Sequence, residues 1–180
     1  MALDALPALV IAWFVLAVII AGWIQGALGF GFPFIATPMV AMATDMRTAV
    51  ITVLLPTLCT VTVTLFTSGP LAAVLKRFWM MPVWATVGAL AGTWLFVALP
   101  DVPYTLVLAA IIIVYLNLDR VARGEWPAIK RHERACGFVA GLTGGLFEGT
   151  ANVAAPPLII YYMGLGLAPA LMVQAIQLCF

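Results

Sequence analysis

Two hydrophobic stretches of this chain are interrupted by glycine and proline at positions where a membrane helix is normally continuous. The first stretch covers residues 21–38 and the second covers residues 140–157. At one constant offset the coincident pairs are Ala21/Ala140, Gly22/Gly141, Gly26/Gly145, Ala36/Ala155 and Pro38/Pro157. Paired broken helices in two halves of a chain are typical of the binding site of a membrane transporter.

The composition is that of a polytopic membrane protein. Hydrophobic residues make up 65% of the chain and charged residues 8%, and the mean hydropathy is +1.17. Soluble domains carry about 25% charged residues, so a soluble fold is excluded. The net charge of +1 gives no basic patch for nucleic acid. The three cysteines are scattered without metal-ligand spacing, and we expect neither a metal nor a cofactor.

Five or six candidate spans are present, since a spanning helix needs about 20 apolar residues. The first region, about 6–44, is too long for one simple span. We interpret it as a helix to about Leu28, a glycine-rich break and a short helix from Pro38. The other candidates are about 48–68, 78–99, 103–118 and 136–162, and a sixth begins near Leu167.

The predicted fold is therefore all-α, a polytopic membrane helix bundle with duplicated halves that each open with a Gly/Pro-broken helix. We divide the chain into a first repeat of about four spans, 1–120, a basic cytoplasmic loop, 121–134, and the start of a second repeat, 135–180. The last residues are still apolar. We expect a truncated protein, or a bundle that a homo-oligomer or a second chain completes.

Charge predicts the orientation of part of the bundle. Lys76 and Arg77 mark one basic loop, and the segment 119–134 holds five more basic residues. Both should be cytoplasmic, and the two spans between them make the assignments agree. Charge does not decide the orientation of the first region. If it crosses once, the N-terminus is inside and the two copies run parallel; if its two pieces each cross, the N-terminus is outside and the copies are inverted.

The first break has the chemistry of a cavity wall. In hydrocarbon every backbone N–H and C=O needs a partner, so such a segment lines a cavity or packs tightly against protein. Thr37-Pro38 is interpreted as a helix start, with Thr as the N-cap and Pro at the first helical position, and Pro156-Pro157 as its counterpart. Two helix N-termini facing one cavity would suit a small anion. The alternative is close helix packing through small residues.

Glu148 is the one charged residue that lies well inside an apolar segment. A carboxyl within the membrane is by default a functional hypothesis. A carboxyl that gains and loses a proton beside an anion site would couple transport to protons. The alternative is a permanently neutral Glu that hydrogen-bonds a neighbouring helix.

Other polar residues complete the candidate site. Gln174 and Gln177 are three residues apart and would point together into a cavity. Thr57, Thr60 and Thr64 form a stripe whose hydroxyls are expected to bond the preceding turn. We assign no catalytic or metal-binding residue, Glu148 to proton coupling, and the following residues to substrate binding: Gln25, Gly26, Gly29, Gly31, Thr37, Pro38, Thr150, Asn152, Pro156, Pro157, Gln174 and Gln177.

Two motifs carry a resemblance to a known family. They are residues 25–33 with Thr37-Pro38, and residues 152–159. The chain resembles the TauE/SafE family, also called the toluene-sulfonate uptake permease family. That resemblance implies a secondary transporter of the inner membrane with about eight spans in a four-plus-four duplication. It also implies sulfite, sulfoacetate, other organosulfonates or related small sulfur-containing anions as substrates. This chain ends inside the second half of that pattern.

We therefore expect a multi-pass protein of the bacterial inner membrane, with the lipid bilayer and a small anion as its partners. Its predicted function is secondary transport of a small sulfur-containing anion, coupled to protons or another ion. A passive anion channel and a structural membrane subunit are the alternatives. An enzyme is not expected, because no nucleophile or metal cluster lies at membrane depth.

Overall fold

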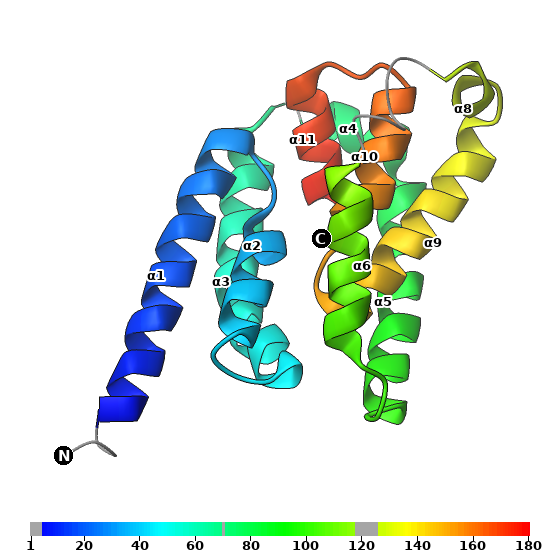
Figure 1. Cartoon of the computed structure of the whole chain (residues 1–180). Helices are drawn as coiled ribbons and strands as arrows, with labels where there is room; N and C mark the ends of the chain where they lie inside the picture. The colour runs from blue at the N-terminus through cyan, green and yellow to red at the C-terminus, as the bar shows by residue number, and fades with distance from the viewer. Residues whose placement is uncertain (1–4, 70, 118–125) are drawn as a thin grey trace.

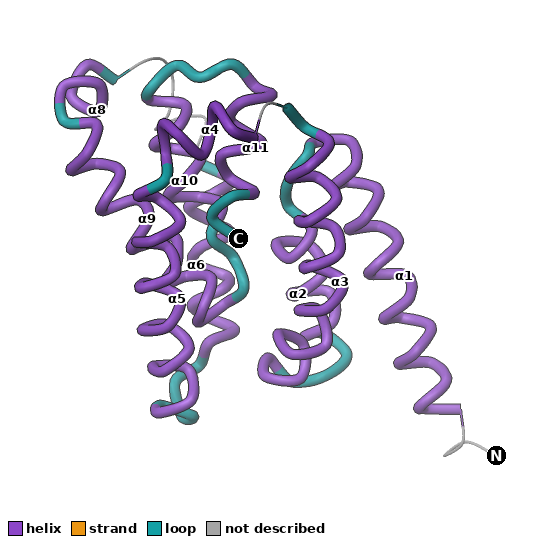
Figure 2. Tube along the Cα trace, turned by 180° about the vertical axis from the view of Figure 1, so that it is seen from behind, coloured by secondary structure: helices purple, strands orange, loops and turns teal. Residues whose placement is uncertain are grey.

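The computed structural model describes residues 5–69, 71–117 and 126–180. Within these ranges the chain consists of helices and loops, without a strand (Figure 2). Three helices in the described part are long and apolar enough to cross a membrane, by length and composition. The prediction of an all-helical membrane protein is confirmed. The boundary expected at 120/121, with Arg120 and Arg123, lies outside the described residues.

The first region folds as a helical hairpin. Helix α1 (Ala5–Leu28) ends where the sequence predicts, and α2 (Phe32–Ala41) turns back along it. Near the open end of this first hairpin, Trp13 Nε1 donates to the Met39 carbonyl at 2.6 Å. At the closed end, Gln25 contacts Phe32. The two helices are therefore antiparallel, as the alternative with two oppositely directed pieces requires.

The predicted helix start at Thr37-Pro38 is wrong. Helix α2 begins at Phe32, so Thr37 and Pro38 lie inside it. The chain reverses at Gly29 and Gly31, whose φ angles of 81° and 106° are ones that glycine adopts readily. Pro33 in the first turn then has the fixed φ that suits a helix start, five residues before the expected Pro38.

Four helices follow in the first part of the chain. They are α3 (Met46–Thr67), α4 (Leu71–Phe78), α5 (Met80–Ala98) and α6 (Tyr104–Leu116). Helix α3 begins at an N-cap, where the Asp45 side chain accepts from the backbone N–H groups of Arg47 and Thr48. The short α4 was not expected, and its last turn carries Lys76 and Arg77.

A second hairpin opens the remaining part. Helix α8 (Pro127–Arg131) precedes α9 (Glu133–Ala151), α10 (Ala155–Gly164) and α11 (Pro169–Gln177). Helix α9 continues through its glycines and ends at Asn152, whose φ of 58° is left-handed. Helix α10 begins with Pro156 and Pro157 in its first turn, as predicted.

The two hairpins point in opposite directions (Figure 1). Helix α1 rises and α2 descends, whereas α9 descends and α10 rises. Of the two alternatives from the sequence, the hairpin directions agree with the one in which α1 and α2 run in opposite directions and the copies are inverted. Helices α4 and α8, which carry basic residues of both predicted cytoplasmic loops, lie at the same end.

Glycines of the second segment pack helices together. A methyl group at Gly145 would overlap the Ala85 carbonyl oxygen on α5, and one at Gly149 would overlap that of Ala89. Gly88 on α5 approaches the Leu142 carbonyl in the same way. Close packing through small residues, the alternative weighed for the breaks, is therefore what these α9 glycines do.

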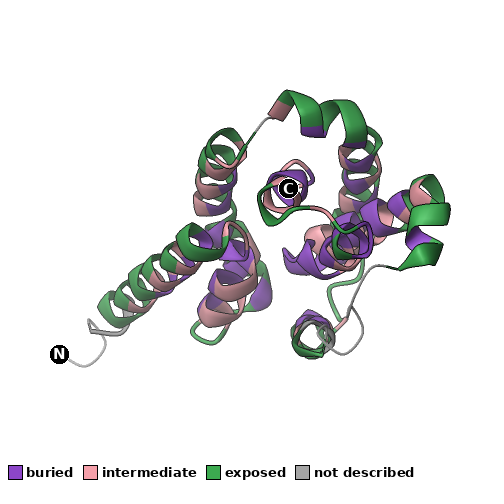
Figure 3. Ribbon diagram, turned by 90° about the horizontal axis from the view of Figure 1, so that it is seen from above, coloured by how far each residue is buried: buried purple, intermediate pink, exposed green. Residues whose placement is uncertain are grey.

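Three apolar cores of described residues hold the bundle together, and one of them groups Met46 of α3 with Phe96 of α5 and Leu108 of α6. Two further cores hold the rest of it. One joins the first hairpin to α3 and includes Phe32 and Val53. The other joins α4, α5 and α8–α11 and includes Leu158 and Ile176. Seen from above, α11 lies inside a ring of helices whose outer faces are exposed (Figure 3). Large apolar side chains on these outer faces include Trp23, Leu55 and Trp94, as expected of a surface in contact with lipid.

Candidate functional site

The two hairpins meet through a buried polar contact. Asn152 Nδ2 donates a hydrogen bond to Thr37 Oγ1 at 3.1 Å. Thr37 lies in the middle of α2, and Asn152 is the left-handed residue that ends α9. Both side chains are buried. These two residues, predicted as members of opposite halves of one site, are therefore in direct contact.

Gln25 holds the linker of the first hairpin. Its Oε1 accepts from the Phe32 backbone N–H at 3.0 Å, so it caps the start of α2. Its Nε2 donates to the Gly29 carbonyl at 3.3 Å and to Thr64 Oγ1 on α3 at 3.2 Å. The buried amide thus satisfies backbone groups that the linker leaves without helical partners.

Glu148 makes the corresponding contact in the second hairpin. Its Oε2 accepts from the Ala154 backbone N–H at 2.9 Å, directly before α10. Its partner among the described residues is thus the linker between its own helix and α10. The carboxylate therefore lies at the N-terminal end of α10, where the helix dipole favours a negative charge.

The residues that occupy equivalent places in the two hairpins are not the residues that the glycine pattern pairs. In the first hairpin a polar side chain, a left-handed residue and a proline follow at four-residue intervals: Gln25, Gly29 and Pro33. In the second the same intervals place Glu148, Asn152 and Pro156. This pairing is displaced by four residues, about one helical turn, from the one that matches Gly22 to Gly141. The shift arises because the α9 glycines serve packing against α5 and not the break.

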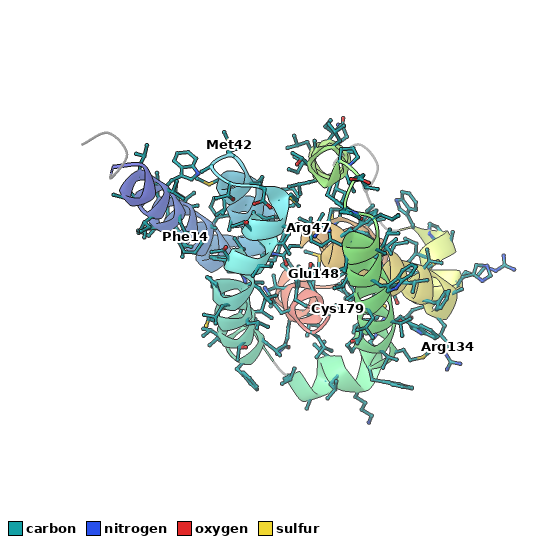
Figure 4. All side chains as sticks on the ribbon, turned by 90° about the horizontal axis from the view of Figure 1, so that it is seen from below. Phe14, Met42, Arg47, Arg134, Glu148 and Cys179 are labelled. Atoms are coloured by element: carbon teal, nitrogen blue, oxygen red, sulfur yellow. The ribbon has the colours of Figure 1, made fainter. Side chains whose placement is uncertain are left out.

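The surroundings of Glu148 are poor in charge. Among the described residues, the structure gives Glu148 no ion pair. Helix α5, which packs along α9, carries no titratable side chain. Seen from below, Glu148 lies in the middle of the bundle, whereas Arg134 projects from its edge (Figure 4). Glu148 is thus a carboxyl held by one backbone donor in an apolar surrounding.

The helix ends offer fewer free donors than the sequence suggested. Pro156 and Pro157 have no N–H, and the Ala154 N–H already bonds Glu148. In the first hairpin Pro33 has no N–H and the Phe32 N–H bonds Gln25. An anion at either helix end would therefore have to compete with a side chain of the protein.

The two glutamines of α11 dock it on the first part of the chain. Gln177 Nε2 donates to the Gly29 carbonyl in the first linker. Gln174 Nε2 donates to the carbonyls of Leu65 and Gly69, at 3.1 and 2.8 Å. Both side chains are buried, and each leaves its Oε1 without a partner among the described residues. The two amides share one helix but bind different segments.

The remaining candidate site residues make no described hydrogen bond between the two hairpins. Thr150 bonds the carbonyls of Leu146 and Phe147 in its own helix. The predicted self-bonding of the α3 threonines is confirmed at Thr57, Thr60 and Thr64. A methyl group at Gly26 or Gly31 would meet nothing within 4 Å, so neither is required for close packing. Pro38 and Pro157 are half-buried.

A bundle of apolar helices with two broken, oppositely directed hairpins and buried polar contacts between them has the features of a membrane transport protein. The family model described as Sulfite exporter TauE/SafE matches residues 14–180. This match covers nearly the whole chain, so the protein belongs to the TauE/SafE family. No curated protein and no solved structure gives a significant match. The family is one of membrane transporters and not of enzymes, and it implies a small anionic substrate and a lipid environment.

Proposed function

We propose that this chain is a proton-coupled secondary transporter of a small sulfur-containing anion, such as sulfite, sulfoacetate or another organosulfonate, across the bacterial inner membrane. The site lies where the two hairpins meet. Gln25, Thr37, Asn152 and Gln177 form its polar wall. The family match supports the substrate class, and the Thr37–Asn152 hydrogen bond supports a site shared by both hairpins.

The contact between Glu148 and Ala154 carries the proposal of coupling. The deprotonated carboxyl occupies the N-terminal end of α10, a position that also suits the substrate anion. Two negative charges at one helix end repel each other. Protonation of Glu148 removes that repulsion, so anion and proton bind together and leave together.

Transport around such a site requires movement between the first hairpin with α3 and the rest of the bundle. Contacts within each half of the bundle are apolar, as two of the cores show. Contacts between the halves include hydrogen bonds from Asn152, Gln174 and Gln177 to α2, α3 and the first linker. A third apolar core also joins the halves, because it groups Met46 of α3 with Phe96 of α5 and Leu108 of α6. Movement between the halves would have to separate this core as well as exchange the hydrogen bonds. Rocking of one half against the other would then open the site to each side in turn.

The test is uptake of radiolabelled sulfite and sulfoacetate by proteoliposomes, with and without an inward proton gradient. The parent chain, Glu148→Gln and Asp101→Asn are compared. Gln25 shows that an amide makes the same linker contact, so Glu148→Gln should preserve the hairpin. Asp101→Asn removes an exposed carboxyl and serves as the control.

Gradient-stimulated uptake by the parent chain and the control, but not by Glu148→Gln, supports the coupled transporter. Uptake that ignores the gradient in all three proteins would identify a passive channel. Absence of flux for both anions in a folded, monodisperse preparation would contradict the proposal and leave a structural subunit.

A further inference from the structure

We propose that the basic end of the bundle binds one anionic phospholipid. Its headgroup would occupy a pocket between the α4–α5 junction and the α8–α9 junction. One acyl chain would lie in an adjoining apolar groove along α9 and α10. This site is separate from the proposed transport site, and its occupation does not depend on the transported anion.

The headgroup pocket combines size with positive charge. Its volume is about 920 Å³. Glu133 is the single carboxylate among its lining residues, whereas the basic ones are Lys76, Arg77, Lys130, Arg131 and Arg134. Arg77 and Glu133 form an ion pair at 3.2 Å, with both side chains partly exposed. The lining therefore keeps an excess of positive charge, which suits a phosphate.

Aromatic side chains surround the same pocket. Trp79 is 58% exposed at the junction of α4 and α5. Trp84 packs edge-on against Phe138 of α9, with 4.6 Å between ring centroids. Amphipathic rings of this kind gather at the level of lipid headgroups. The pocket thus lies at the end of the bundle where a headgroup is expected.

The apolar groove adjoins the headgroup pocket directly. It has a volume of about 400 Å³ and shares Ala135 and Tyr161 with the basic pocket. Its walls include Val139 on α9 and Ile160 on α10. The Tyr161 hydroxyl donates to the Glu133 carbonyl at 3.2 Å, which fixes the ring between the two hollows.

The pairing of these two chemistries distinguishes a lipid from a free anion. A soluble phosphate would use the basic pocket alone, and a lipid without net negative charge would gain little from that pocket. An anionic phospholipid uses both, because its phosphate and acyl chain are covalently joined. Each Lys or Arg near a membrane surface strengthens the binding of an anionic headgroup by about fivefold.

The test is native mass spectrometry of the full chain in detergent, titrated with dioleoyl phosphatidylglycerol or dioleoyl phosphatidylcholine. We expect one phosphatidylglycerol to bind more tightly than phosphatidylcholine. The double substitution Lys76→Gln, Arg131→Gln should weaken phosphatidylglycerol binding by roughly 25-fold, taking about fivefold for each charge. Arg47→Gln, at the opposite end of the bundle, is the control that removes a charge elsewhere.

A second variant tests the groove without changing charge. Val139 is 56% exposed, so Val139→Trp can fill the groove from its outer wall without entering the core. It should weaken phosphatidylglycerol binding and leave thermal stability unchanged. Equal binding of the two lipids, or unchanged binding in the double variant, would overturn the proposal. Displacement of the lipid by inorganic phosphate alone would assign the pocket to a soluble anion instead.

Discussion

At the scale of single residues, the two hairpins differ most at one position. Gln25 and Glu148 each bond the backbone just before the second helix of their hairpin. An amide does this at one linker and an ionisable carboxyl at the other. Both side chains therefore hold the linker of their hairpin, and only Glu148 can also bind a proton. This is the physical reason for proposing that Glu148 couples transport to protons.

The Thr37–Asn152 hydrogen bond allows the contact between the hairpins to be measured. We predict that Thr37→Val and Asn152→Gly each lower the free energy of unfolding, and that their effects are not additive. Coupling energies of membrane hydrogen bonds average about 0.6 kcal/mol and reach about 1.7. Asn152→Gly is preferred to Ala because Gly adopts the left-handed φ of 58° without strain.

Unfolding of the two single variants and the double variant in mixed micelles completes the cycle. Thr150→Val is a suitable control, since the Thr150 hydroxyl bonds only its own helix among the described contacts. Additive losses for Thr37 and Asn152 would mean that the two side chains do not interact, and the shared site would lose its main support.

Polar residues in apolar segments were enough to predict several partners of this contact network. Gln25, Thr37, Asn152 and Gln177 are polar residues within apolar segments, and the sequence predicts all four as members of the site. Which of them touch was beyond the sequence, because Thr37 and Asn152 are 115 positions apart. The role of Glu148 at the α10 linker was missed. The sequence signal for it is the repeated four-residue spacing of a polar residue, a Gly or Asn, and a Pro.

At the scale of helices, the breaks were predicted better than the restarts. The end of α1 and the prolines of α10 were expected from glycine and proline signals. The start of α2 was placed late because Thr37-Pro38 has the form of an N-cap, while Pro33 already begins the helix. The sequence pattern predicts a break at the α9 glycines, whereas in the structure they allow α5 to approach closely.

Two glycine substitutions test whether α5 and α9 are in close contact. Gly145→Ala should destabilise the protein by about 1–3 kcal/mol, because its methyl group would overlap the Ala85 carbonyl oxygen and push α5 from α9. Gly22→Ala should be neutral or stabilise by about 0.5–1 kcal/mol, because nothing lies within 4 Å of its added methyl. Thermal unfolding of both variants measures the difference. Equal effects would show that α5 and α9 are not in close contact.

At the scale of the molecule, oppositely directed hairpins bring both linkers into one bundle. Composition predicted a membrane protein, and charge predicted that Lys76-Arg77 and the basic loop share one end. Whether the copies are parallel or inverted could not be decided from the bare N-terminus. In the structure the two hairpins run in opposite directions, and the antiparallel packing of α1 and α2 behind this depends on contacts such as Trp13 with Met39. The duplication of whole halves stays a prediction.

The most direct test of the account is proton movement that accompanies anion uptake. Proteoliposomes containing a pH-sensitive dye are given an inward gradient of sulfoacetate, whose acidic groups stay ionised near neutral pH. The account predicts internal acidification with the parent chain. It predicts none with Glu148→Gln, although exchange of labelled for unlabelled sulfoacetate continues. Acidification by Glu148→Gln equal to that of the parent chain would contradict the role assigned to this carboxyl.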